Sequence, residues 1–127
     1  MINFIIPGEL PDLNTIIAAS KDHFGKYSNI KSTFTDIVTW YATGLLKGLK
    51  RVHIVCHWYC KDRRKDPDNV AAGVKFILDG LVHAGVIEND GWKQISGIEH
   101  RFSVDKEHPR VEVALYAAGM EAKEVRA

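Results

Sequence analysis

The spacing of apolar residues along the chain predicts strands and helices in alternation. An apolar run over residues 2–7 predicts a short strand, and alternation over residues 52–60 predicts a longer strand with rather apolar faces. Apolar residues recur at helical spacing from about Ser28 to Leu49 and again from about Asn69 to Ala84. The second helix is expected to end there because Gly85, which follows, is a typical residue after a helix C-terminus.

Turn-forming and polar residues predict the connections, and the end of the chain predicts a hairpin. Residues 8–14 and 61–68 are expected to be loops. Lys106–Pro109 is expected to turn between two strands that bury alternate side chains, namely Ile98, His100, Phe102, Val104, Val111, Val113 and Leu115. The order β-α-β-α-β-β predicts a compact α+β domain over residues 1–118, followed by a charged tail over residues 119–127.

Composition is that of an ordinary globular protein, with 46% hydrophobic and 26% charged residues in a chain of 127. The formal net charge of +1 means that any contact with nucleic acid must come from local charge. No apolar run approaches the roughly 18 residues of a membrane span, so no membrane partner is expected. Residues 1–7 lack the basic leader and long apolar core of a signal peptide, so we expect a cytoplasmic protein.

Two cysteines and two histidines interleave in the predicted strand over residues 52–60. Cys56 and Cys60 would lie about 13 Å apart at the usual rise of a strand, which is too far for a disulfide. A strand also places His53 and His57 on the face opposite the cysteines, so packing is a better interpretation of these residues than zinc binding.

The residues that suggest chemistry are carboxylates around the second predicted helix, directly after a basic loop. The carboxylates are Asp66, Asp68, Asp79 and Asp90, and the basic residues are Lys61, Arg63, Arg64 and Lys65. On a continuous helix, Asp68, Lys75 and Asp79 would fall within roughly 40° of one another. A divalent metal that acts on phosphate needs hard oxygen ligands, and a polyanion needs cations. The pattern therefore predicts a metal-dependent nuclease.

Each of these features also has a structural interpretation. An aspartate before a helix is a favoured N-cap, Lys75 and Asp79 have the spacing of a surface ion pair, and Asn89-Asp90-Gly91 is a typical turn. One cap, however, needs one acid rather than both Asp66 and Asp68. The combination favours a site over three unrelated structural roles.

Two other kinds of site do not fit the sequence. An EF-hand that began at Asp66 would place Val70, Ala71 and Ile77 where oxygen ligands or a glycine turn are required. No Gly-x-x-x-x-Gly-Lys-Ser/Thr loop occurs, so no nucleotide cofactor is expected. Trp92, two residues after Asp90, is expected to be a packed core residue rather than to stack on an unpaired base.

The combined motif resembles the RusA-type Holliday junction resolvases, a family found mainly in phages and prophages. The matching segments are Asp66-Pro67-Asp68-Asn69, Lys75 with Asp79-Gly80-Leu81, Ala84-Gly85-Val86-Ile87, Asn89-Asp90, Cys56-His57 with the basic loop, and the opening loop that ends at Asn14. The chain departs from the family pattern in two places. Three extra residues separate Asn69 from Lys75, and Asn89 stands where an aspartate often precedes the last acid.

This resemblance implies a small mixed β-sheet packed with helices, assembled as a homodimer. It implies Mg²⁺-dependent cleavage of four-way DNA junctions by symmetric strand incision in recombination and repair, with Mn²⁺ as a substitute. The implied metal ligands are Asp66, Asp68, Asp79 and Asp90, with Lys75 at the attacked phosphate, and the implied DNA contacts are Lys61, Arg63, Arg64, Lys65, Asn14 and Asn69. Two alternatives remain open: a nuclease for flap DNA or RNA, and a phage DNA-binding protein without catalysis.

Overall fold

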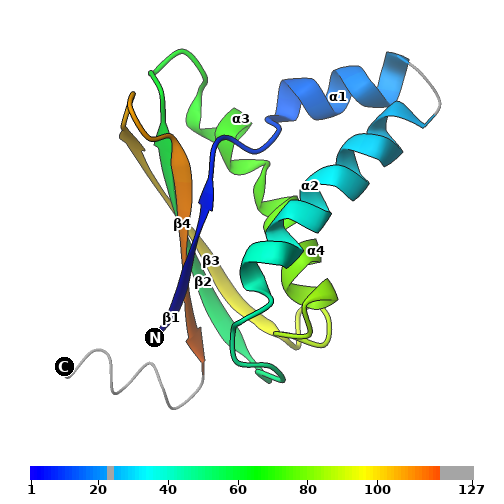
Figure 1. Cartoon of the computed structure of the whole chain (residues 1–127), viewed down its shortest axis with the longest axis vertical. Helices are drawn as coiled ribbons and strands as arrows, with labels where there is room; N and C mark the ends of the chain where they lie inside the picture. The colour runs from blue at the N-terminus through cyan, green and yellow to red at the C-terminus, as the bar shows by residue number, and fades with distance from the viewer. Residues whose placement is uncertain (23–24, 118–127) are drawn as a thin grey trace.

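Four strands form one mixed β-sheet in the order β1-β4-β2-β3 (Figure 1). Strands β1 (Ile2–Pro7) and β2 (Val52–Cys60) both pair antiparallel with β4 (Arg110–Ala117), and β3 (Ile95–Val104) pairs parallel with β2. The computed structural model describes residues 1–22 and 25–117, so the predicted tail over 119–127 lies outside the described residues. The predicted small mixed sheet of an α+β fold is confirmed.

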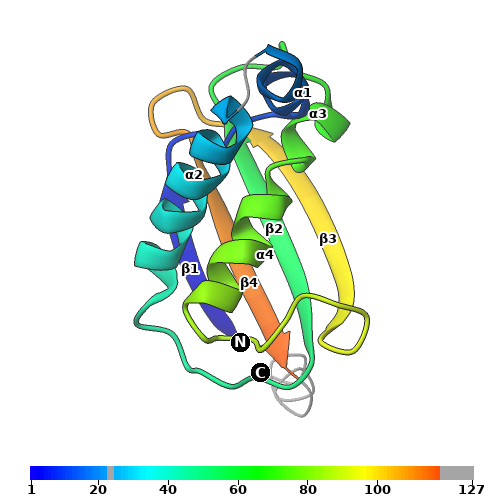
Figure 2. The same cartoon turned by 90° about the vertical axis from the view of Figure 1, so that its right-hand side faces the viewer.

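Helices cover one face of this sheet and leave the other face open (Figures 1 and 2). They are α1 (Leu13–Asp22), α2 (Lys26–Ala42), α3 (Pro67–Ala71) and α4 (Val74–His83). In Figure 2, α2 and α4 lie over β1, β4 and β2, whereas β3 is an edge strand beside this helical layer. Among residues 1–22 and 25–117, no helix combines the length and the apolarity needed to cross a bilayer.

The core lies between the helices and the inner face of the sheet. Both predicted strands, over residues 2–7 and 52–60, are confirmed. Alternate residues of β2 point into the core, and Ile54 and Cys56 are fully buried there against Phe76 and Leu81 of α4. A large apolar side chain such as Ile54, Phe76 or Leu81 contributes about 1.5–3 kcal/mol to folding when it is fully buried.

The predicted hairpin at the C-terminus is wrong, because β2 lies between β3 and β4 in the sheet. An alternating pattern identifies a strand but does not say which strand is its neighbour. The prediction that β3 points its apolar side chains inward is also wrong for three of them, since Ile98, Phe102 and Val104 are 40%, 41% and 47% exposed. They lie on an edge strand that the helical layer does not cover.

The predicted helix over residues 69–84 is two helices, which are separated at Ala72 and Gly73. A Cβ atom on Gly73 would lie 3.1 Å from both the Leu10 Cβ and the Trp58 ring, so the chain passes very close to these two side chains at the break. The other predicted helix ends earlier than expected, at Ala42. The sequence pattern missed α1 altogether.

Candidate functional site

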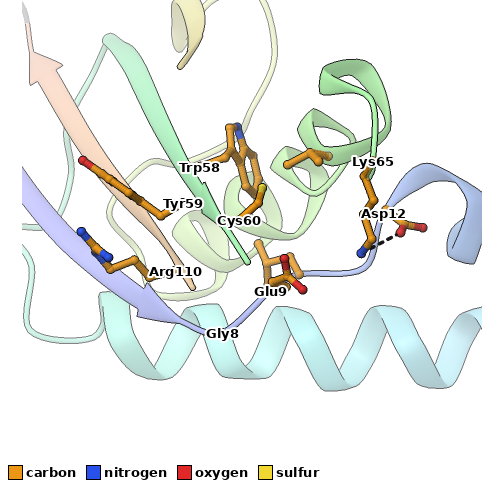
Figure 3. Close-up of a pocket in the computed structure, with 10 residues that line it drawn as sticks. Gly8, Glu9, Asp12, Trp58, Tyr59, Cys60, Lys65 and Arg110 are labelled. Carbon is orange, nitrogen blue, oxygen red and sulfur yellow. Dashed lines mark ion pairs between the residues drawn. The ribbon is translucent and has the colours of Figure 1, made fainter. Parts of the chain in front are cut away.

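The loop after β1 and the basic loop after β2 meet at one end of the sheet, and Asp12 joins them (Figure 3). The Thr15 backbone N–H donates to Asp12 Oδ1 at 2.7 Å, which caps α1. Lys65 Nζ lies 2.9 Å from Asp12 Oδ2. Asp12 is only 7% exposed, so one buried carboxylate holds the start of α1 against the basic loop.

The environment of this ion pair keeps both of its groups charged. Burial alone would raise the pKa of Asp12, but the hydrogen bonds from Thr15 and Lys65 outweigh burial and lower the pKa below its ordinary value. The bond to Asp12 raises the pKa of Lys65, although burial opposes this shift. The contact therefore persists at neutral pH.

Asp12→Asn is expected to lower the free energy of unfolding by about 1.5 kcal/mol at pH 7, because asparagine still caps a helix but leaves Lys65 without its anion. The folded state lowers the pKa of Asp12. The Asp12 carboxylate therefore adds to the free energy of unfolding above the unfolded pKa of about 3.9, and this addition is lost as pH falls through the folded pKa. Urea unfolding at pH 7 and pH 3 should therefore show the two proteins converging in acid. Asp22→Asn, which removes a largely exposed pair with Lys26, is the control. An equal deficit at both pH values would contradict the ion-pair account.

A groove of about 400 Å³ lies beside Lys65 at the same end of the sheet. Its lining joins charged residues of the basic loop to apolar residues of α3 and β3, and comprises Cys60, Asp62, Arg63, Lys65, Asp66, Pro67, Val70, Phe102, Ser103 and Val104. Its volume lies within the range of about 300–1,000 Å³ found for ligand sites. We refer to it below as the charged groove.

Asp66 and Asp68 lie two residues apart at the start of α3, where the lining of the charged groove reaches Asp66 and Pro67. Asp66 occupies the N-cap position with extended backbone, makes no capping hydrogen bond and lines the groove. Asp68 Oδ1 accepts a hydrogen bond from the Asn69 backbone N–H at 2.9 Å. Asn69 Oδ1 in turn accepts from the Asn14 backbone N–H at 3.0 Å. Both aspartates are exposed, so their carboxylates are available to a ligand.

The other predicted metal ligands lie elsewhere. Asp79 belongs to α4 and lines a hollow against α2, where its Oδ2 lies 4.0 Å from Lys75 Nζ. Because the helix breaks at Gly73, the predicted row of Asp68, Lys75 and Asp79 does not exist. Asp90 lies in the loop between α4 and β3, at the end of the sheet opposite α3 (Figure 2).

A single chain therefore does not assemble the predicted set of four metal ligands. Within residues 1–22 and 25–117, no three side chains of histidine, cysteine, aspartate or glutamate gather as a metal site. Mg²⁺, however, is commonly held by one or two carboxylates together with water and substrate phosphate. Asp66 and Asp68 suit that arrangement, because both carboxylates are exposed and Asp66 lines a groove that also contains Arg63 and Lys65. They do not suit a metal cage built from one chain alone.

The four predicted DNA-binding cations of the basic loop have different surroundings. Lys65 is held by Asp12, and Arg64 Nε lies 3.7 Å from Asp62 Oδ2. Arg63 lines the charged groove and forms no hydrogen bond or ion pair with the described residues. Lys61 is exposed at the start of the loop. Arg63 is thus the cation best placed to receive a phosphate beside Asp66.

The zinc alternative gains no support from the structure. Cys56 is fully buried on the inner face, while His53 and His57 lie on the open face of the sheet, as the alternation predicts. Burial raises the pKa of the Cys56 thiol to about 12, which disfavours the thiolate that a metal would need. Both Cys56 and Cys60 are free thiols.

Sequence reasoning missed Asp12 and Phe102 as parts of this region, and it placed Trp92 wrongly. The spacing of Asp12 and Thr15 is that of a helix cap and was the available signal for α1. Nothing in the alternation of β3 shows that Phe102 lines a groove. Trp92 is 96% exposed rather than packed in the core.

A scan against protein-family models found no match, and a search of curated proteins found none that is similar.

Proposed function

We propose that the chain is a Mg²⁺-dependent endonuclease that cuts four-way DNA junctions and accepts Mn²⁺ as a substitute. The observation that carries this proposal is that Asp66 and Arg63, both exposed, line one groove, with the exposed Asp68 two residues from Asp66. The four-way junction and the homodimer come from the resemblance of the motif to RusA-type resolvases, and the cytoplasmic location comes from the expectation that residues 1–7 are not a signal peptide. The proposed site leaves out Lys75 and Asp79, which lie together on α4.

In this proposal, the residues in and around the charged groove have separate roles in phosphodiester hydrolysis. Asp66 and Asp68 would hold Mg²⁺, which lowers the pKa of bound water and neutralises charge that develops on the phosphate. Arg63 binds a non-bridging oxygen of the phosphate and orients it. Lys65 is fixed by Asp12 and adds positive charge to the groove. The Asn14 backbone N–H donates to the Asn69 side-chain oxygen, which joins α1 to α3 beside Asp68.

Two-fold symmetry suits this task. Resolution of a junction requires cuts in two strands of like polarity, and a symmetric dimer presents two identical sites. The second strand then remains held near its site after the first cut.

Arg63→Ala is expected to weaken junction binding and to flatten its dependence on salt. The plot of log affinity against log salt concentration has a negative slope, and each lost phosphate contact reduces the magnitude of that slope by about 0.9. Affinity should be measured by fluorescence anisotropy over a salt series, with a chelator present to prevent cutting. Lys93→Ala, at the opposite end of the sheet, is the matched control. A slope that falls for Lys93→Ala but not for Arg63→Ala would show that DNA does not bind at the charged groove.

The choice of substrate is tested by binding in chelator to a four-way junction, a linear duplex, a flap and an RNA hairpin. The proposal predicts the tightest complex with the four-way junction. Tighter binding to the flap or to RNA would favour the corresponding nuclease instead.

A further inference from the structure

Part of the lining of the charged groove is apolar. Val70 of α3, Cys60 of β2, and Phe102 and Val104 of β3 line the groove beside the charged residues of the basic loop. Cys60 and Val104 are partners in the register of the sheet, and Phe102 shares a face with Val104 because alternate residues of a strand point to the same side. Phe102 and Val104 are 41% and 47% exposed, so this apolar lining is open to a ligand.

Phe102 is the most exposed ring of an aromatic stack that begins in the core. Trp58, which is buried, donates from Nε1 to His100 Nδ1 at 2.9 Å, and the centroids of these two stacked rings lie 6.0 Å apart. The His100 ring stacks in turn with Phe102, at a centroid distance of 6.3 Å and an interplanar angle of 24°. Burial lowers the pKa of His100, so its imidazole stays neutral and Nδ1 can accept the bond from Trp58. The stack therefore supports the Phe102 ring while leaving much of it exposed.

The apolar lining shares its groove with a cation and a carboxylate that are both available to a ligand. Arg63 forms no hydrogen bond or ion pair with the described residues, and Asp66 is exposed. An exposed aromatic ring offers its face to another planar ring, and a guanidinium with free N–H groups binds phosphate. A nucleotide joins a planar ring to a phosphate, so the groove is complementary to a nucleotide in both shape and charge.

We propose that the charged groove holds one unstacked nucleotide of the DNA substrate, with its base on the Phe102 ring and its phosphate at Arg63. A base in an intact duplex is paired and stacked, so it must leave the helix before it can reach the ring. Leaving the helix costs least where the base is mismatched or already single-stranded. This inference rests on the proposed function, and it gives the site a physical reason to prefer branched DNA over linear duplex.

Binding of short single strands in chelator tests this nucleotide site without reference to cutting. One probe is a thymidine oligonucleotide, and the other is a strand of the same length built only from stable abasic residues, so that both carry the same phosphate charge. The wild-type chain should bind the thymidine strand about tenfold more tightly than the abasic strand, because one base stacked on an aromatic side chain contributes at least a factor of that order. Fluorescence anisotropy measures both affinities.

Three variants assign the two parts of the nucleotide. Phe102→Leu keeps an apolar side chain but has no ring face, so it should bind the two strands equally, whereas Phe102→Trp should keep the wild-type difference. Arg63→Ala should weaken binding of both strands by the same factor, since both contain phosphate. Phe102 is 41% exposed, so these changes should leave the fold intact, which circular dichroism checks. Trp40→Ala, which removes an exposed aromatic on α2, is the control and should also keep the wild-type difference.

Equal binding of the two strands by wild type, or a difference that survives in Phe102→Leu, would overturn the nucleotide site. These outcomes are distinguishable from failure of the proposed function. If wild type cuts junctions but binds the two strands equally, the nucleotide site is wrong and the proposed function stands. If wild type prefers the thymidine strand through Phe102 but never cuts a junction in Mg²⁺ or Mn²⁺, the nuclease proposal is wrong and the nucleotide site stands.

Discussion

Asp66→Asn and Asp68→Asn are each expected to abolish Mg²⁺-dependent cutting of a four-way junction while leaving junction binding intact or tighter. An amide has nearly the shape of a carboxylate but lacks its charge, so it is a poor ligand for a hard cation. Loss of residues that merely orient a metal ligand typically costs 10- to 100-fold, so loss of a ligand should cost more than about 100-fold. Single-turnover cleavage rates and binding in chelator measure the two effects separately.

Asp36→Asn is the matched control for these variants, because Asp36 is an exposed aspartate on α2. It should cut at the wild-type rate. Turnover by both Asp66→Asn and Asp68→Asn at that same rate would contradict the assignment of the acids. Tighter binding with lost cutting would support it, because removing negative charge favours contact with DNA.

Gly80→Ala is expected to lower the free energy of unfolding by on the order of 3 kcal/mol, because the added methyl group overpacks a close helix contact. Helices α2 and α4 cross at this position, and a Cβ atom on Gly80 would lie 2.6 Å from Val38 Cβ and 3.1 Å from the Thr39 backbone nitrogen. Gly80 and Val38 are both buried, so neither can move aside cheaply. The higher helix propensity of alanine offsets only about 1 kcal/mol of this loss in the free energy of unfolding.

Gly44→Ala is the control for this stability change, because a Cβ atom on Gly44 would meet nothing within 4 Å. The free energy of unfolding should change by less than about 1 kcal/mol in that variant. Chemical denaturation of both variants and of wild type measures the difference. Equal stability of Gly80→Ala and Gly44→Ala would show that the two helices do not pack as closely as described.

Periodicity predicted the parts of the fold that depend on one element alone. The alternation over Val52–Cys60 marks a strand whose alternate residues are buried, and the structure has that strand with the same ends. The neighbours of a strand depend instead on contacts between distant segments. The pattern therefore could not show that β2 lies between β3 and β4, or that β3 is an edge strand.

In the candidate site, too, the sequence predicted the residues that lie close together in the chain but not those that depend on the path of distant segments. Asp66 and Asp68 are two residues apart, so their backbones stay close in any fold, and Arg63 is near them for the same reason. The predicted position of Asp79 depended on an unbroken helix, but the helix breaks at Gly73, where an added Cβ atom would lie 3.1 Å from both Leu10 and Trp58. The position of Asp90 depended on the path of the chain after α4, which leads to the opposite end of the sheet.

The central claim is that this chain cuts four-way junctions with the help of Mg²⁺, and a cleavage assay tests it most directly. A synthetic junction labelled on two opposing strands should be incubated with the protein in Mg²⁺, in Mn²⁺ and in chelator, beside a linear duplex of the same sequence. We predict paired incisions at symmetric positions with either metal, none in chelator, and far slower cutting of the duplex. Tight binding to the junction without any incision in either metal would contradict the nuclease and leave a DNA-binding protein.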